Sequence, residues 1–275
     1  TGAGGLGVGR GMHPIYEMRR TSPGSFALIA TRYFHTYGLS PEEGKKTIGR
    51  IAVKNHYNGS LHPKAHLRRT VTLDQVLQAP IIAWPLGLFD CCGNSDGSAA
   101  AILTRADLAK KFRPDPIYIK GLGLACDEML PHFRPGFDWL GFKANREASW
   151  QAYEQAGIKN PREELSVAEV HDCFTITEMI IYEDFGFSSQ GRAREDIEAG
   201  TFELKGSLPV NADGGLKSFG HPIGASGIRM TYEVYKQLQG KAGDRQIKDA
   251  RLGLSHTLGG PPQVAAVAVF GNEPG

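Results

Sequence analysis

The chain has 275 residues, enough for one large domain or two small ones with a sizeable apolar core. Its 31 basic and 29 acidic residues nearly cancel, which argues against nucleic acid or an anionic membrane surface as the main partner. Four cysteines without a CxxC spacing favour a reducing compartment, so we expect a cytoplasmic protein. The sequence contains no run of 18 apolar residues and no signal-peptide pattern, and it therefore predicts neither a membrane span nor export.

Apolar periodicity and capping signals predict helices and strands along the chain. Ser40, Pro41 and Glu43 combine an N-cap serine, a proline at the first helical position and a glutamate three residues later, which starts a helix. In chain order the sequence predicts helices over 23–37, 41–56 and 73–77, a strand over 99–104, a helix over 105–112, a strand over 117–124, a helix over 145–157, a strand over 166–170, helices over 174–185 and 223–239, and strands over 251–255 and 264–270. Because strands alternate with helices, the predicted fold class is α/β.

Two loop segments suggest a binding role. Residues 2–7 formally match the GxGxxG pattern of dinucleotide-binding turns, but no strand precedes them and Pro14 follows, so a flexible loop is the favoured interpretation. Residues 57–80 are rich in His, Pro, Lys and Arg and lack a sustained period. This segment predicts a surface excursion whose basic face could meet an anionic ligand.

Histidines suggest metal ligands at two places, and neither is convincing. His62 and His66 are four residues apart, but Pro63 disrupts a helix there and no third ligand is spaced nearby. The run HDC at 171–173 has no second cluster to complete a four-ligand shell. We therefore predict no metal and no permanently bound cofactor.

The segment NADGGLKSFGHPIGASG at 211–227 places His221 directly before Pro222 in a turn crowded with glycines. Pro222 fixes the local backbone and removes one donor. Small neighbours let a ligand approach the main chain, and the start of the following helix points amide dipoles at the same place. His221 is therefore either an active-site base or a histidine that stabilises the loop by hydrogen bonding.

Three segments in this order resemble signature blocks of the C-terminal part of thiolases: VAEVHDCFTITEM at 167–179, NADGGLKSFGHPIGASG at 211–227 and GLSHTLGG at 253–260. DCCGNSDGSAAA at 90–101 also resembles the family's DGAAA strand. The sequence is most similar to the branch of sterol-carrier-type thiolases and lipid-transfer-type acetyl-CoA acetyltransferases. The resemblance implies a five-layer αβαβα fold with an incomplete N-terminal half: 1–112 would be the latter part of that half, including the loop excursion, and 113–275 the C-terminal half.

The resemblance also implies roles for individual residues. His221 matches the histidine that activates the nucleophilic cysteine and helps to hold the thioester oxygen. His171 takes the place of an asparagine, a position that holds a catalytic water facing the same oxygen, and Gly259 matches a glycine whose backbone amide belongs to the second oxyanion hole. The positions implied to bind substrate or coenzyme A are Cys92, Asp96, Gly97 and Ser226.

Two departures from the family pattern bear on the chemistry. Thr257 stands where many thiolases have a second cysteine that acts as acid and base, so His256 beside it, or a bound water, would take that role. The family's nucleophilic cysteine opens a helix in a small-residue setting that this sequence lacks. Free cysteines are usually small buried hydrophobes, so a longer polypeptide or a separate chain is expected to supply the nucleophile, in preference to Cys91, Cys92, Cys126 or Cys173.

The implied function is acyl transfer, namely thiolase-type cleavage or formation of a 3-ketoacyl-CoA, a reaction of lipid metabolism with coenzyme A thioesters as substrates. Two alternatives stay open: retro-aldol cleavage of a β-hydroxyacyl-CoA on the same fold, which needs no cysteine, and a noncatalytic acyl-CoA-binding subunit. A chain cut in this way would expose sheet surface. We therefore expect a homodimer or a heteromer with a chain that completes the fold, with a small OB-fold protein as a further candidate partner.

Overall fold

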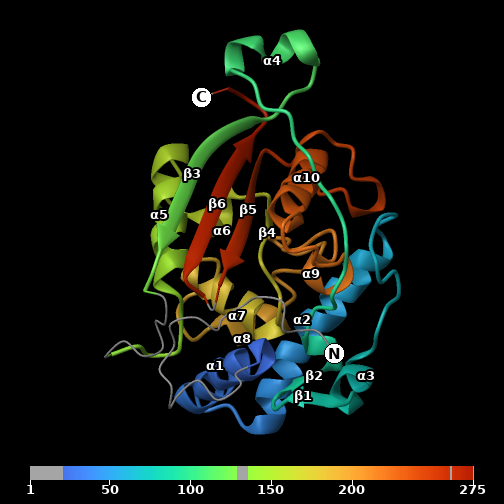
Figure 1. Ribbon diagram of the computed structural model, residues 1–275, viewed down its shortest axis with the longest axis vertical. Helices are drawn as coiled ribbons and strands as arrows, with labels where there is room; N and C mark the ends of the chain where they lie inside the picture. The colour runs from blue at the N-terminus through green and yellow to red at the C-terminus, as the bar shows by residue number, and fades with distance from the viewer. Residues whose placement is uncertain (1–20, 129–135, 261, 275) are drawn as a thin grey trace.

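A computed structural model describes residues 21–128, 136–260 and 262–274, and its largest sheet has four strands in the order β3-β6-β5-β4 (Figure 1). The strands are β3 (Tyr118–Cys126), β6 (Val264–Gly271), β5 (Leu252–Gly259) and β4 (Val167–Glu169). β6 is antiparallel to both of its neighbours, whereas β4 and β5 are parallel. The predicted α/β class is confirmed.

Helices pack on both faces of this sheet. On one face, α5 (Lys143–Ala156) lies so close to β3 that a Cβ at Gly121 or Gly123 would overlap carbonyl oxygens of the helix. On the other face, α10 (Ser226–Leu238) packs on β5, where Thr231 Oγ1 lies 3.1 Å from Ser255 Oγ. Because successive residues of a strand point to opposite faces, the odd-numbered residues of β5 face α10 and the even-numbered residues face the other side.

The first third of the chain forms a helical base below the sheet, made of α1 (Ser22–Thr36), α2 (Pro41–Ser60) and α3 (Leu73–Gln78) (Figure 1). α1 and α2 pack against α7 (Thr175–Asp184). The predicted capping box starts α2: the N–H of Glu43 donates to Ser40 Oγ at 3.2 Å, and the N–H of Ser40 donates to Glu43 Oε2 at 2.9 Å. α2 also packs against α9 (Gly215–Ser218), which leads into His221, so the base supports the loop that carries this histidine.

Shorter elements connect these parts. They are the ribbon of β1 (Ile81–Ala83) and β2 (Leu86–Gly87), a 3₁₀ turn at Leu88–Asp90, α4 (Ala106–Phe112), α6 (Pro161–Glu164), α8 (Ala193–Glu198) and a 3₁₀ turn at Gly243–Arg245. The predicted helix over 105–112 corresponds to α4. The sequence did not predict β1, β2, α6, α8 or α9, because such short elements show little periodicity.

The strand predicted over 99–104 is wrong. This segment is coil, and Ile102 and Leu103 are 96% and 77% exposed. An apolar run becomes a buried strand only where a neighbouring strand supplies backbone partners, and no described strand pairs with it. The strand predicted over 251–255 spans Leu252–Gly259, so Gly259 is its last residue. The glycine pattern at 2–7 lies outside the described residues.

Candidate functional site

The three sequence motifs meet at the carboxyl edge of the parallel strands β4 and β5. His171 follows β4 by two residues, and the register of the two strands places it level with Thr257. His221 precedes α10, and the first turn of α10 touches the same edge, since a Cβ at Gly227 would lie 2.9 Å from Thr257 Cγ2. Gly259 is the last residue of β5. This edge is where α/β sheets commonly bind ligands.

Two serines hold His221 in place. Its backbone N–H donates to Ser95 Oγ at 2.7 Å, and its ring Nδ1 lies 2.8 Å from Ser226 Oγ. The Ser226 hydroxyl donates to the carbonyl of Pro222 at 3.0 Å, so its oxygen accepts the proton on Nδ1, and Nε2 carries the lone pair. Burial, and then the positive charge of Arg229, lowers the pKa of His221 to about 4. The ring is therefore neutral at neutral pH, in the tautomer that can accept a proton at Nε2.

His171 faces His221 edge to face, with ring centroids 5.2 Å apart and an interplanar angle of 88°. The His171 side chain is buried, and its Nδ1 has no hydrogen-bond partner among the described residues. Burial lowers the pKa of His171 well below its usual value, and the neighbouring His221 and His256 add to the effect. An unpartnered nitrogen on a buried neutral ring is available to a substrate group or to water.

Asp172 ties the end of β4 to the loop that carries His221. Its carboxylate accepts the backbone N–H of Leu216 at 2.6 Å and that of Lys217 at 3.3 Å. The fit is close enough that a Cβ at Gly215 would overlap the carboxylate. Asp172 therefore fixes α9 relative to β4. Asp172 was not among the predicted site residues, although an acidic side chain inside the HDCF block was a signal that could have identified it.

His256 points to the face of β5 opposite α10. Its Nδ1 accepts the backbone N–H of His171 at 3.4 Å, and its Nε2 lies 3.1 Å from Asn145 Oδ1, to which it donates. Burial lowers the pKa of His256 to about 3, so the ring is neutral. Both ring nitrogens thus have protein partners, and this geometry does not direct either of them at the pair of His171 and His221.

The positions implied to bind coenzyme A differ in their surroundings. Ser226 lies at the site itself, bonded to His221. Gly97 lies beside the same loop, since a Cβ there would be 3.0 Å from Pro222 Cγ. Cys92 is bonded to the segment that follows His171, since its N–H donates to the carbonyl of Cys173 at 2.9 Å, and Asp96 is exposed.

Three of the four cysteines are buried or half-buried thiols close to the motif loops. Burial is the main cause that raises the pKa of Cys91 to about 11 and that of Cys92 to about 12, and it raises the pKa of Cys173 well above its usual value. The thiolate is the nucleophilic form, so these thiols are weakly reactive at neutral pH. Cys126 is exposed at the end of β3, two strands away from Gly259 in the β3-β6-β5 register.

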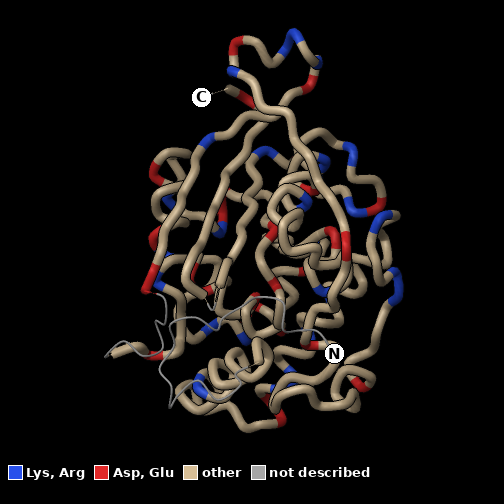
Figure 2. The backbone as a smooth tube through the Cα atoms, viewed as in Figure 1, with Lys and Arg blue, Asp and Glu red and all other residues tan. Residues whose placement is uncertain are grey.

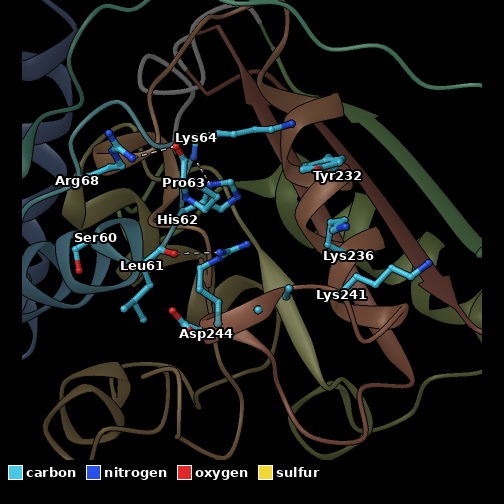
Figure 3. Close-up of a pocket in the computed structure, with 13 residues that line it drawn as sticks. Ser60, Leu61, His62, Pro63, Lys64, Arg68, Tyr232, Lys236, Lys241 and Asp244 are labelled. Atoms are coloured by element: carbon cyan, nitrogen blue, oxygen red, sulfur yellow. Dashed lines mark hydrogen bonds between the residues drawn. The ribbon is translucent and has the colours of Figure 1, made fainter.

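A basic groove of about 500 Å³ opens between the loop after α2 and the C-terminal half of α10 (Figure 3). Its charged lining residues are Lys64, Arg68, Lys236, Lys241, Arg245 and Asp244. Arg245 pairs with buried Glu233 at 2.9 Å, and Lys241 pairs with Asp115. The other three basic residues of the groove have no salt bridge among the described residues. Elsewhere Lys and Arg are interspersed with Asp and Glu over the chain (Figure 2), so this groove is a local concentration of positive charge.

The basic groove and the histidine pair share two structural elements. The N–H of His66 donates to the carbonyl of Phe219 at 2.9 Å, and the N–H of Leu67 donates to that of Ser218 at 2.9 Å, so the groove loop runs beside the residues that precede His221. α10 starts at the serine bonded to His221 and carries the groove residues Tyr232 and Lys236 on its later turns. An anionic ligand of the basic segment 57–80, as predicted from the sequence, would therefore bind near the C-terminal end of α10, and the histidine pair lies at the N-terminal end of the same helix.

Part of the sheet face beside α10 is exposed in the described chain. Leu122 and Leu124 of β3 and Val264 of β6 are 52%, 65% and 37% exposed. By register, Val264 pairs with Gly259, and all three apolar side chains lie on the α10 side of the sheet. We call this surface the open sheet face.

Among the described residues, no group of three or more His, Cys, Asp or Glu side chains is arranged to hold a metal ion. A search of the same residues finds no helix with the length and apolar character needed to cross a membrane.

Comparisons with known proteins confirm the predicted thiolase-like fold. A family model described as "Thiolase C-terminal domain-like" matches residues 132–272. The chain is 38% identical over 250 residues to an acetyl-CoA acetyltransferase of Methanothermobacter thermautotrophicus, covering 91% of this chain and 63% of that protein. It is 32% identical to sterol carrier protein 2 of Gallus gallus, covering 86% of this chain and 43% of that protein. The chain thus spans about six-tenths or less of the length of these curated relatives.

A solved structure has a similar fold. The structure titled "Ltp2-ChsH2(DUF35) aldolase" superposes with a TM-score of 0.78 at 25% identity, covering 92% of this chain and 64% of that chain.

Proposed function

Because this chain belongs to the thiolase family, we propose that it acts in acyl transfer between coenzyme A thioesters, by cleaving or forming a 3-ketoacyl-CoA. The observation that carries this proposal is the pair of neutral histidines, His171 and His221, set edge to face at the carboxyl edge of β4 and β5. Its relatives named as acetyl-CoA acetyltransferases support the same reaction class.

His221 is the proposed base. Its Nε2 accepts the proton of a cysteine thiol, and the thiolate attacks the keto carbonyl of the 3-ketoacyl-CoA. The carbon–carbon bond then breaks, leaving the acyl group on the cysteine as a thioester and the shorter acyl-CoA as an enolate, which takes up the proton that His221 accepted. The thiol of a second coenzyme A accepts the acyl group and returns its proton to the cysteine sulfur.

His171 and Gly259 are the proposed stabilisers of negative charge. The unpartnered ring of His171 holds a water that faces the thioester oxygen, and the backbone N–H of Gly259 points at the second developing oxyanion. Such donors contribute roughly 3–4 kcal/mol each when they are aimed at the charge of the transition state. The low pKa of His171 supports this role, because a neutral ring can hold a water without carrying charge into the site.

The nucleophilic cysteine is proposed to come from a segment outside the described residues or from a second chain. The raised pKa values of Cys91, Cys92 and Cys173 support this, because thiols of this kind are protonated at neutral pH. We propose that the segment that carries the cysteine packs on the open sheet face, next to Gly259. The assembly would then be a homodimer or a heteromer, with a small OB-fold protein as a further partner.

The basic groove is proposed to hold the phosphate groups of coenzyme A. Lys64, Arg68 and Lys236 offer positive charge there, and the groove shares α10 with the histidine pair. An extended phosphopantetheine arm lying along α10 would connect the two places. Each residue of an α-helix advances by about 1.5 Å, so Lys236, ten positions after Ser226, lies roughly 15 Å further along the helix axis.

The test is an assay of the purified assembly with acetoacetyl-CoA and coenzyme A, following the appearance of acetyl-CoA by chromatography. We expect turnover in the wild type, a loss of about 10²–10⁴-fold in kcat/KM for His221→Ala, and inactivation with one iodoacetamide-labelled cysteine. An unlabelled, inactive assembly that still binds acyl-CoA would instead support a noncatalytic subunit.

Retro-aldol cleavage of a β-hydroxyacyl-CoA is the second candidate function. Two observations favour it: the similarity to the aldolase structure, and the protonated state of the buried thiols. An aldolase leaves the thioester intact, whereas acyl transfer in the synthetic direction releases one coenzyme A thiol for each turnover. Titration of free thiols during turnover separates the two reactions.

A further inference from the structure

We propose that His256 is a positioning residue for His171, and that Asn145, Asp184 and Arg146 fix His256 in the one tautomer that can serve this purpose. The inference deepens the proposed function and rests on it in one respect, namely that His171 contacts the substrate or its water. The hydrogen-bond chain itself is independent of the reaction.

The directions of the bonds at His256 are determined by its partners. The backbone N–H of His171 can only donate, so Nδ1 of His256 accepts it with a lone pair, at 3.4 Å. Nε2 of His256 then carries the proton and donates it to Asn145 Oδ1 at 3.1 Å. The ring packs edge to face against Phe185, with centroids 4.8 Å apart, and is only 1% exposed.

Asn145 is held in the matching orientation by a buried carboxylate. Its Nδ2 donates to Asp184 Oδ2 at 3.2 Å, which leaves Oδ1 facing His256. Asp184 also accepts the backbone N–H of Phe142 at 2.9 Å and Arg146 Nε at 2.7 Å. If the amide group of Asn145 were rotated by half a turn, its oxygen would face the Asp184 carboxylate and its NH₂ group would face the N–H of His256. Both contacts would be unfavourable, so the observed orientation is strongly preferred.

This chain of bonds runs from Arg146, which is partly exposed, through the buried Asp184, Asn145 and His256 to the main chain at the end of β4. It approaches from the face of β5 opposite α10. Asp172 holds the same segment from the other direction through the backbone of α9. His171 is thus held at its own N–H and at the next residue, which sets the position of its ring relative to His221.

Two substitutions at the same position test this role. His256→Asn keeps an acceptor oxygen close to the place of Nδ1, whereas His256→Leu keeps the volume and loses both polar atoms. We expect His256→Leu to lower kcat about tenfold with little change in KM, because one hydrogen bond contributes roughly 1–1.5 kcal/mol, and we expect His256→Asn to restore most of the rate. Equal rates in the leucine variant and the wild type, or equal losses in both variants at unchanged folding, would overturn the proposal.

A spectroscopic measurement on the unmodified chain separates this inference from the proposed reaction. Labelling the histidines with ¹⁵N should show one ring with a protonated Nε2 and an unprotonated Nδ1 that does not titrate between pH 5 and 8, and this signal should be absent from His256→Asn. The backbone amide of His171 should exchange slowly with solvent in the wild type and faster in His256→Leu. A His256 ring with the opposite tautomer, or one that titrates in this range, refutes the inference even where no substrate is turned over. The expected signals in an inactive protein would refute the reaction alone.

Discussion

Ser226 accepts the Nδ1 proton of His221 at 2.8 Å, across the turn that starts α10, while its own hydroxyl proton goes to the carbonyl of Pro222. The serine therefore selects the tautomer of the histidine. We expect Ser226→Ala to lower kcat/KM about tenfold, because the loss of one hydrogen bond frees the ring to turn and to exchange tautomers. Ser226→Thr keeps a hydroxyl and should retain most of the rate. A threonine variant as slow as the alanine variant would argue that the volume, and not the hydroxyl, matters here.

The acid side of the pH–rate profile should reflect the lowered pKa of His221. Burial and Arg229 lower this pKa from the usual 6.5 to about 4, so the neutral base persists as the pH falls through 6 and 5. We therefore expect kcat/KM to stay level down to about pH 5 and to fall as the pH approaches 4. A fall centred near pH 6.5, measured in buffers of constant ionic strength, would show that His221 is not the base or is not buried in the working assembly.

The buried carboxylate of Asp172 should be needed for stability. Asp172→Asn replaces one acceptor oxygen with an NH₂ group, so that either the N–H of Leu216, bonded to Oδ1, or that of Lys217, bonded to Oδ2, faces a donor instead of an acceptor. The expected loss is about 2 kcal/mol in the free energy of unfolding above pH 7, where the carboxylate is charged, because burial raises the pKa of Asp172 to about 7. Asp107→Asn, at an exposed site on α4, is the matched control and should change little. Urea denaturation measures both, and equal midpoints would contradict the assigned role.

Charge reversal in the basic groove should weaken the binding of coenzyme A esters and spare the chemistry. For Lys236→Glu we expect KM for acyl-CoA to rise several-fold, most at low salt, with kcat almost unchanged. The same variant should act normally on the acyl-pantetheine, which lacks the phosphates. Lys205→Glu, an exposed lysine that does not line the groove, is the control. A rise in KM for both substrates would show that the groove does not act by binding the phosphates.

The close contact between β3 and α5 requires a residue without a side chain at position 123. A Cβ at Gly123 would overlap backbone atoms of Ala148, which cannot move aside as the end of a flexible side chain can. Gly123→Ala should therefore destabilise the fold by roughly 1–3 kcal/mol or more. Gly93→Ala, where a Cβ meets nothing within 4 Å, should stay close to the wild type in thermal unfolding. Similar melting temperatures for the two variants would refute the close packing.

The sequence by itself determined the local structure. The capping box at Ser40 and the helices predicted over 23–37 and 145–157 depend on neighbours a few residues away, and each appears in the structure. The motif at 211–227 likewise indicated a histidine in a tight turn. These features were predictable because their causes, namely caps, periodicity and steric freedom, are local.

Only the tertiary structure decided which of these residues meet. His171 and His221 are 50 positions apart in the sequence. The sheet register and α10 bring the centroids of their rings to 5.2 Å from each other. The same register turned His256 away from that pair, because successive residues of a strand point to opposite faces. The apolar run at 99–104 did not become a strand, since burial and pairing depend on a neighbouring strand and not on the apolar residues alone.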